Sequence, residues 1–254
     1  MITIKFKIDE DIIARRIISK NCMLTSFANY LWEKHNDSYK LLKSNFLSEN
    51  IDLEIINELK KTNFFQKDIQ QAKSNLKRIK KNWLDYKKII LDCLKNIFKT
   101  EIQLNVICYI TQPNLNTGVN IGNNQFLWGH INGLSDKNYD LVYLIHESLH
   151  SLFNKGDLEH AIIEKIADIE LSRKLNKTDN CGYPTHCFTK DFHKQIFPFW
   201  NLYMKRSYKT ILKEQEIFNI VYNINKFEIY RKKLEKINIF DFIKFLKQEI
   251  PKLN

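Results

Sequence analysis

The sequence predicts a predominantly helical α+β fold with a small mixed or antiparallel sheet. Glycine and proline are scarce, at 6 and 4 of 254 residues, which favours long helices over a loop-rich all-β fold. Apolar residues make up 44% of the chain, enough for a sizeable buried core. Over 66–98, apolar residues recur at spacings of three and four, as on one face of a long helix.

The elements before this long helix follow from local patterns. Alternating apolar and polar residues predict a strand over 2–8. Residues 10–35 predict two helices, and 39–63 predicts further amphipathic helical pieces.

After residue 100 the pattern changes. Residues 102–110 are rich in β-branched and aromatic side chains and predict a strand. Two further short strands are predicted over 118–122 and 125–131, on either side of an Asn-Asn turn. A helix follows and is predicted to continue to about Asn154.

A second helix is predicted over 157–175, and the remainder, 188–254, is predicted to be largely helical. Interruptions are expected near Pro198 and around 235–240. These elements predict one domain (1–254) in three consecutive parts: a mainly helical part over 1–100, a core with the sheet and the helix pair over 101–176, and a helical part over 177–254.

The charge of the chain bears on its binding partners, and its cysteine content bears on its cellular compartment. The net charge is +11, but Lys, Asn and Ile are abundant everywhere and no nucleic-acid motif is recognisable. The lysines of 66–98 lie mostly off its apolar face, which is typical of a solvated face, so nucleic acid is not favoured as a partner. Five scattered cysteines indicate a reducing cytoplasm, and no apolar run suits a signal peptide or a membrane span.

The candidate chemistry lies in the stretch HESLH, residues 146–150. Residues four apart share one face of a helix, so His146 and His150 can hold one metal ion. Glu147 lies on the adjacent side, near the position of a metal-bound water. Neutral imidazoles bind Zn²⁺, and the glutamate can take the proton of that water. The pattern therefore predicts one Zn²⁺ per chain, with Glu147 as the catalytic residue.

Such a site needs a third protein ligand, and His160, Glu164, Asp168 and Glu170 lie on the next predicted helix. If the two helices run antiparallel, Glu164 and the midpoint of the histidines both lie about 9 Å from the turn. His160 and Asp168 miss that level by about 6 Å and Glu170 by about 9 Å. Glu164 is therefore the predicted third ligand. Asp168, one turn further on, is predicted to accept the outer N–H of a ligating histidine.

HESLH followed by EKIAD (164–168) resembles the gluzincin metallopeptidases, which combine HExxH with a downstream glutamate, often in an ExxxD pattern. The resemblance implies a zincin-like helix pair that binds zinc, with Glu147 as general base and acid. It also implies a small sheet whose edge strand holds the substrate backbone, here 125–131. One departure is the spacer of 13 residues before Glu164, which is shorter than in thermolysin-like enzymes. The longer spacer of those enzymes would make Glu170 the ligand.

The expected function is therefore that of a cytoplasmic zinc metallopeptidase acting on peptides or proteins. Peptide hydrolysis also needs a donor for the developing oxyanion, and the candidates are Tyr183, His186, His193 and His130. Two alternatives stay open. One is a catalytically inactive zincin-like scaffold that acts as a binding module, and the other is a basic helical nucleic-acid-binding protein in which HESLH is accidental.

Overall fold

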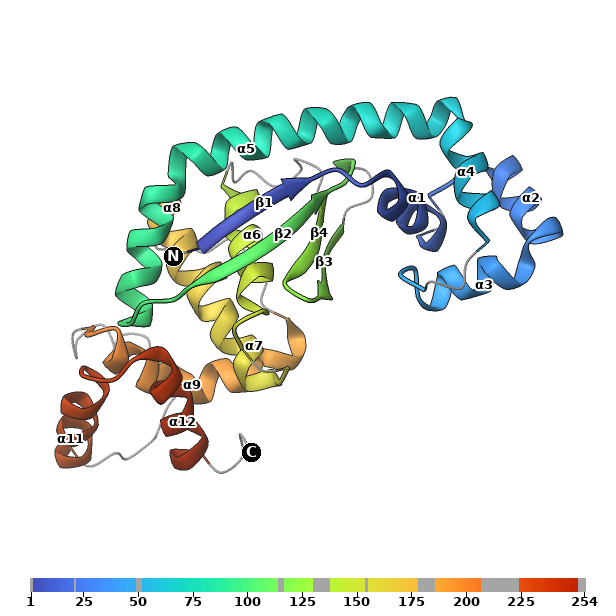
Figure 1. Cartoon of the computed structure of the whole chain (residues 1–254). Coiled ribbons are helices and arrows are strands. Elements are labelled where there is room, and N and C mark those ends of the chain that lie inside the picture. Colours follow the sequence, from blue (N-terminus) through green and yellow to red (C-terminus); the bar gives the residue numbers. More distant parts are fainter. Residues whose placement is uncertain are drawn as a thin grey trace. The chain divides into compact units, whose positions relative to one another are not determined.

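The computed structural model of the chain describes residues 2–20, 22–48, 52–113, 117–129, 138–153, 155–177, 186–206 and 224–250. These residues are mostly helical and include one mixed four-stranded sheet, so the predicted fold class is confirmed (Figure 1). The chain divides into two compact units, each collected from distant segments. Unit 1 comprises 1–2, 87–104 and 152–254, and unit 2 comprises 3–86 and 105–151. The single domain in three consecutive parts stays a prediction.

The sheet has the strand order β1-β2-β4-β3. Its strands are β1 (Ile2–Lys7), β2 (Leu104–Ile110), β3 (Thr117–Gly122) and β4 (Gln125–Gly129). β4 pairs in parallel with β2 and antiparallel with β3. Asn123 and Asn124 both have positive φ, as a tight turn between β3 and β4 requires. All four predicted strands are confirmed.

The position of β4 differs from the sequence-based expectation. β4 lies inside the sheet and β3 at its edge, so the prediction that 125–131 is the edge strand is wrong. The burial pattern gives the reason. Residues Phe126 to Gly129 are all buried, as in a strand that is covered on both faces, whereas Gly118 on β3 is exposed.

Helices surround a compact core at the N-terminal end of unit 2. The elements are α1 (Glu10–Ser19), α2 (Thr25–Lys34), α3 (Asn36–Ser44), α4 (Leu53–Lys61) and the start of α5 (Asn63–Phe98). Asp9 caps α1 by accepting the N–H of Ile12, and Asp52 caps α4 by accepting that of Glu54. Their apolar faces meet in one cluster that includes Ile13, Ile17, Leu31, Leu42, Ile55, Leu59, Phe65 and Ile69.

A buried polar junction fixes α6 (Tyr139–Leu149) in unit 2. The carboxylate of Asp140 accepts a hydrogen bond of 2.9 Å from the indole N–H of Trp128 on β4. It also forms an ion pair with Arg78 on α5, and Arg78 donates to Asn75 Oδ1 at 2.6 Å. One carboxylate thus joins a strand, the long helix and the helix that carries HESLH.

We expect Asp140→Ala to lower the free energy of unfolding by about 2–3 kcal/mol, because it leaves a buried indole N–H and a guanidinium without their acceptor. Urea denaturation followed by circular dichroism measures the effect. The control is Asp11→Ala, which removes an exposed ion pair with Lys60 and should change the free energy by less than about 1 kcal/mol. Equal losses in the two variants would contradict this assignment.

In unit 1, a continuous helical run covers the segment that the sequence predicts as the second helix of the pair. It consists of α7 (Asp157–Glu164), the π-helical segment η2 (Lys165–Leu171) and α8 (Ser172–Asn176). The π-helical part is not apparent from the sequence. π-Helical turns are rare and occur frequently at functional sites.

The α-helices that follow in the described residues are α9 (Lys190–Tyr203), α11 (Ile224–Leu234) and α12 (Ile239–Glu249). The predicted break around 235–240 is confirmed, since α11 ends at Leu234 and α12 begins at Ile239. The predicted break near Pro198 is wrong, because α9 continues through this residue. Packing explains the continuity: Trp200 and Tyr203 both lie against Phe242 of α12, with ring centroids 5.9 and 4.6 Å apart. Across the described residues, every helix is too short or too polar to cross a membrane.

Candidate metal centre

The HESLH segment lies at the C-terminal end of α6, within unit 2. His146 is buried and His150 is half-buried. Their ring centroids are 5.1 Å apart, with the rings inclined at 64°. The two imidazoles are therefore neighbours on one side of the helix, which is the arrangement that a shared metal ion would require.

Aromatic rings pack against the imidazole of His146. Tyr143, one turn earlier on α6, stacks on His146 with centroids 5.7 Å apart. The same tyrosine stacks on Trp128 of β4 at 5.3 Å, and Trp128 is itself fixed by Asp140. The orientation of His146 is therefore set by a column of rings that begins in the sheet.

Glu147 lies beside the edge strand of the sheet. Its side chain is buried, and its backbone carbonyl accepts a hydrogen bond of 3.3 Å from the amide of Asn120 on β3. A Cβ atom at Gly118 would lie 3.6 Å from Glu147 Oε1 and only 2.9 Å from the Trp128 ring. Glycine at this position thus allows the backbone of β3 to pass close to the Trp128 ring, with Glu147 in van der Waals contact beyond it.

A buried thiol in unit 2 has no nucleophilic character. Burial raises the pKa of Cys108 well above its ordinary value, and the charges of Glu147 and Asp140 raise it further. The thiol therefore stays protonated at neutral pH, which does not favour covalent catalysis by this cysteine.

α6 ends at Leu149 and not near Asn154. Phe153 explains the early end, because its buried ring packs in unit 1 against Phe98 and Phe240 at 6.0 and 5.9 Å. Residues 150–152 form turns instead of continuing the helix. Because α6 ends earlier than predicted, the midpoint of the two histidines and Glu164 are no longer equally far from the turn. The role of Glu164 as a ligand stays a prediction.

Glu164, the last residue of α7, is fully buried in unit 1. Its Oε1 accepts the backbone N–H of His186 at 2.8 Å, just before the short helix η3 (Cys187–Thr189). Its Oε2 accepts the hydroxyl of Thr189 at 2.6 Å and lies 2.5 Å from Nε2 of His193 on α9. These three contacts occupy all but one of the roughly four acceptor positions of a carboxylate.

This network also determines the charge of Glu164. Burial alone would raise the pKa of the carboxyl group, but the hydrogen bonds from His193, the His186 N–H and Thr189 outweigh burial and lower the pKa to about 2. The carboxylate is therefore ionised at neutral pH. A carboxylate that binds a metal ion must be ionised. An ionised carboxylate is also the stronger acceptor for three hydrogen-bond donors.

Two further histidines adjoin Glu164 in unit 1. Nε2 of His160, one turn earlier on α7, lies 3.8 Å from Glu164 Oε1. The ring of His186 lies 4.9 Å from that of His160, and both rings contact Phe188. The spacing of four residues between His160 and Glu164 could have indicated their proximity from the sequence. The contacts of Thr189 and His186 could not have been found in that way.

The other predicted residues of unit 1 have different surroundings. Asp168 is buried within η2. Nη2 of Arg206 donates to both carboxylate oxygens of Glu170, at 2.7 and 2.8 Å, and Trp200 Nε1 donates to Oε1 at 2.9 Å. A guanidinium thus already compensates the charge of Glu170.

The candidate oxyanion donors divide into two groups. His193 is engaged with Glu164, and His186 is exposed beside Phe188. Tyr183 and His130 lie outside the described residues.

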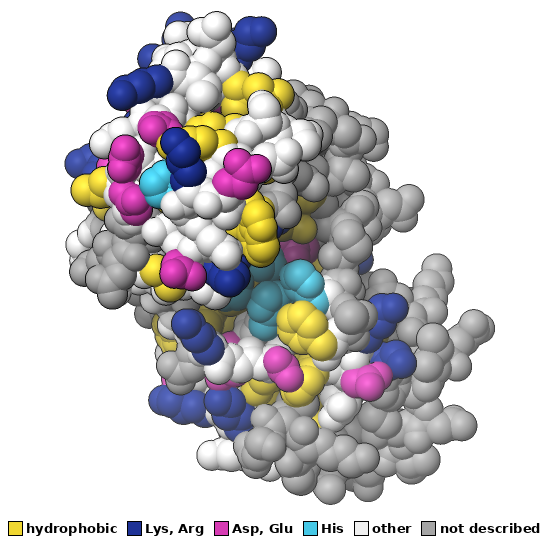
Figure 2. All heavy atoms as spheres, turned by 90° about the vertical axis from the view of Figure 1, so that its right-hand side faces the viewer, with side chains coloured by type: hydrophobic (Ala, Val, Ile, Leu, Met, Phe, Trp, Pro, Cys, Tyr) yellow, Lys and Arg dark blue, Asp and Glu magenta, His cyan; other side chains and the backbone are white. Residues whose placement is uncertain are grey.

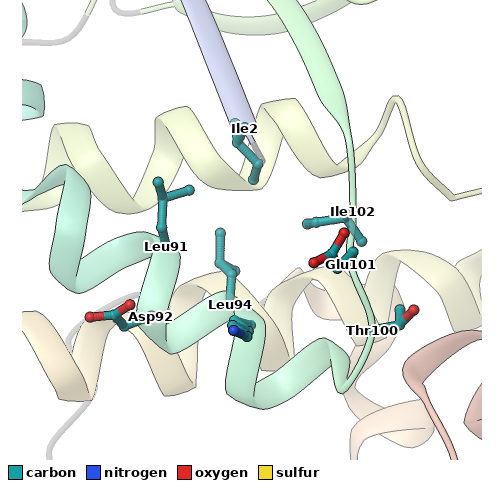
Figure 3. A pocket seen from close by; sticks show the side chains of 8 residues that line it. Ile2, Leu91, Asp92, Leu94, Thr100, Glu101 and Ile102 are labelled. Carbon is teal, nitrogen blue, oxygen red and sulfur yellow. The ribbon is translucent and has the colours of Figure 1, made fainter.

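Unit 1 also contains a pocket of about 260 Å³. Figure 3 shows Ile2, Leu91 and Ile102 around it, with Asp92 and Glu101 among the polar lining residues. None of the predicted site residues lines this pocket, so it has no part in the chemistry considered for HESLH.

Comparisons of the chain with protein-family models, with curated proteins and with solved structures found no match.

Proposed function

We propose that this protein is a zinc-dependent metallopeptidase of gluzincin type. The observation that supports this most is the end of α6, where two neighbouring imidazoles and a buried glutamate occur in the order HExxH. Because His146 and Glu147 belong to α6 and His150 caps its end in a helical conformation, their spacing is set within this one segment.

In this proposal His146 and His150 hold Zn²⁺ through neutral imidazole nitrogens. When bound, the ion would polarise the scissile carbonyl and lower the pKa of a water molecule. Glu147 accepts the proton of that water on a carboxylate oxygen and passes it to the leaving amine. The third ligand, Glu164, and the supporting carboxylate, Asp168, are proposed from the sequence. The free acceptor position of Glu164 is compatible with that role.

The sheet supports a peptide as the substrate. Among the described residues no strand pairs with the outer side of β3, so this edge offers backbone donors and acceptors. An extended peptide can add to such an edge as a further strand. Since Glu147 lies beside β3, a peptide bound there would be close to the proposed base.

We also propose a cytoplasmic location, because five cysteines without the spacing of a disulfide framework suit a reducing compartment. The alternative function, a binding module without hydrolysis, is favoured by one observation. The hydrogen bonds to Glu164 tie α7, η3 and α9 together, and they can do so without a metal ion.

Metal content tests the proposal directly. Protein purified in the presence of zinc and then dialysed should contain about one Zn²⁺ per chain by mass spectrometry of the metal. His146→Ala/His150→Ala should lose this ion, whereas His35→Ala, which alters an imidazole paired with Asp52 in the same unit, should keep it. A peptide library should be cleaved by the zinc-loaded protein and not after chelation. Zinc in the double variant at the wild-type level would refute the proposed site, and zinc without cleavage would support the binding module.

A further inference from the structure

The part of α5 that belongs to unit 2 carries a row of exposed lysines. Four of them form what we term the α5 lysine stripe: Lys73, Lys77, Lys80 and Lys81. At about 100° per residue they fall within an arc of about 100° on the helix surface. Ala72, Ile79 and Trp83, which lie on another side of the helix, are buried. The helix is therefore anchored by its core face while the lysines face solvent.

In the part of unit 2 that the structure describes, negative charge beside the stripe is sparse. No described carboxylate lies within 4.0 Å of any of its lysines, whereas Lys60, Lys194 and Lys247 each have such a partner. Asp68 of the same helix is buried and accepts a hydrogen bond from Gln112 at 2.9 Å. Asp85 is exposed and follows Lys81 by four residues, about 40° outside the arc, so it can offset the charge of that one lysine.

The spacing of the lysines makes this concentration of charge unfavourable for the helix alone. Lys77 lies four residues from both Lys73 and Lys81, and like charges at this spacing repel each other and destabilise a helix. An anionic partner would relieve the repulsion at all these positions together.

The composition of the stripe indicates the kind of anion. No aromatic ring is exposed within it, since Trp83 and Phe65 are buried, so it offers no surface on which single-stranded bases could stack. On the face drawn in Figure 2, the upper part, where α2–α4 lie, shows basic side chains interspersed with acidic and apolar ones. A regular polyanion suits the stripe better than it suits that surface.

We propose that the α5 lysine stripe binds the phosphate backbone of double-stranded nucleic acid, without base specificity. Lys73 and Lys81 are about 12 Å apart along the helix axis, and a duplex presents about seven phosphate charges over that length. The sequence by itself favours a solvated face. That interpretation changes because the helix is anchored by its core face and, of the four lysines, only Lys81 has a carboxylate one helical turn away. The inference does not depend on zinc or on peptide hydrolysis.

The test is fluorescence anisotropy of a labelled 20-base-pair duplex with the full chain, in chelator and over a range of salt concentrations. The duplex should bind, with log Kd depending on log salt. Lys73→Gln/Lys77→Gln/Lys80→Gln/Lys81→Gln should flatten the slope by about 3–4, at about 0.9 per lost phosphate contact. At 0.1 M salt its affinity should fall on the order of 10- to 100-fold. Circular dichroism and the thermal midpoint should match the wild type.

A matched variant controls for net charge. Lys155→Gln/Lys190→Gln/Lys232→Gln/Lys236→Gln removes four exposed lysines of unit 1 and should leave the slope within about one of the wild type. The proposal is overturned if the stripe variant keeps the wild-type slope, or if both variants lose affinity equally. It is also overturned if single strands bind as tightly as the duplex, or if phosphatidylserine vesicles bind through the stripe and the duplex does not.

Discussion

Glu147→Gln should lose peptide hydrolysis and keep zinc. Glutamine has nearly the same shape as glutamate but cannot accept the proton of the attacking water, and loss of a general base typically costs about 10²- to 10⁴-fold in rate. His146 and His150 are unchanged in this variant, and Tyr143 still stacks on His146, so metal binding should persist. The measurement is kcat/KM for a peptide found in the library screen, together with the zinc content of the same preparation.

The matched control is Glu159→Gln. Glu159 is also buried, but it lies on α7 in unit 1 and pairs with Lys247 at 2.6 Å. Its replacement should leave kcat/KM within about threefold of the wild type. If Glu147→Gln retained more than about a tenth of wild-type kcat/KM, Glu147 would not be the general base.

Glu164→Ala should destabilise unit 1 by about 3–5 kcal/mol, because a buried charged acceptor is removed from three donors at once. Thr189→Val removes only one donor from the same carboxylate and should cost about 1–2 kcal/mol. Urea denaturation followed by circular dichroism compares the two variants. A loss below about 1 kcal/mol in Glu164→Ala would contradict the structural role of the network.

The same variant separates the structural role from metal binding. If Glu164 is the third ligand, competition with a chromophoric chelator at a temperature where the variant is folded should show zinc affinity reduced at least about 100-fold. If Glu164 only holds the helices of unit 1 together, zinc affinity should stay within about threefold of the wild type while stability still falls.

Local patterns allowed most elements to be predicted. The long helix α5 follows from apolar residues such as Ile69, Ile79 and Ile90, all of which are buried. The four strands follow from alternation and from β-branched content, and their bounds agree with the structure to within two residues. These signals are local because each depends on which face of one element meets the core.

The sequence-based predictions that were wrong have one cause in common. Pro198 lies inside α9 because Trp200 and Tyr203 pack against α12, and α6 ends early where Phe153 turns into the core of unit 1. The order of β3 and β4 also depends on which strand is covered on both faces. In each case a contact between segments distant in sequence overrides the local preference.

For the candidate site, the sequence alone determined the chemical types and the spacing of His146, Glu147 and His150, because one helical turn converts a spacing of four into proximity. Only the tertiary structure decided that Glu147 lies beside the edge strand β3. It alone decided, too, that Glu164 receives hydrogen bonds from residues 22 to 29 positions later in the chain. Contacts between residues so far apart in the sequence depend on how whole elements pack, and no local periodicity encodes them.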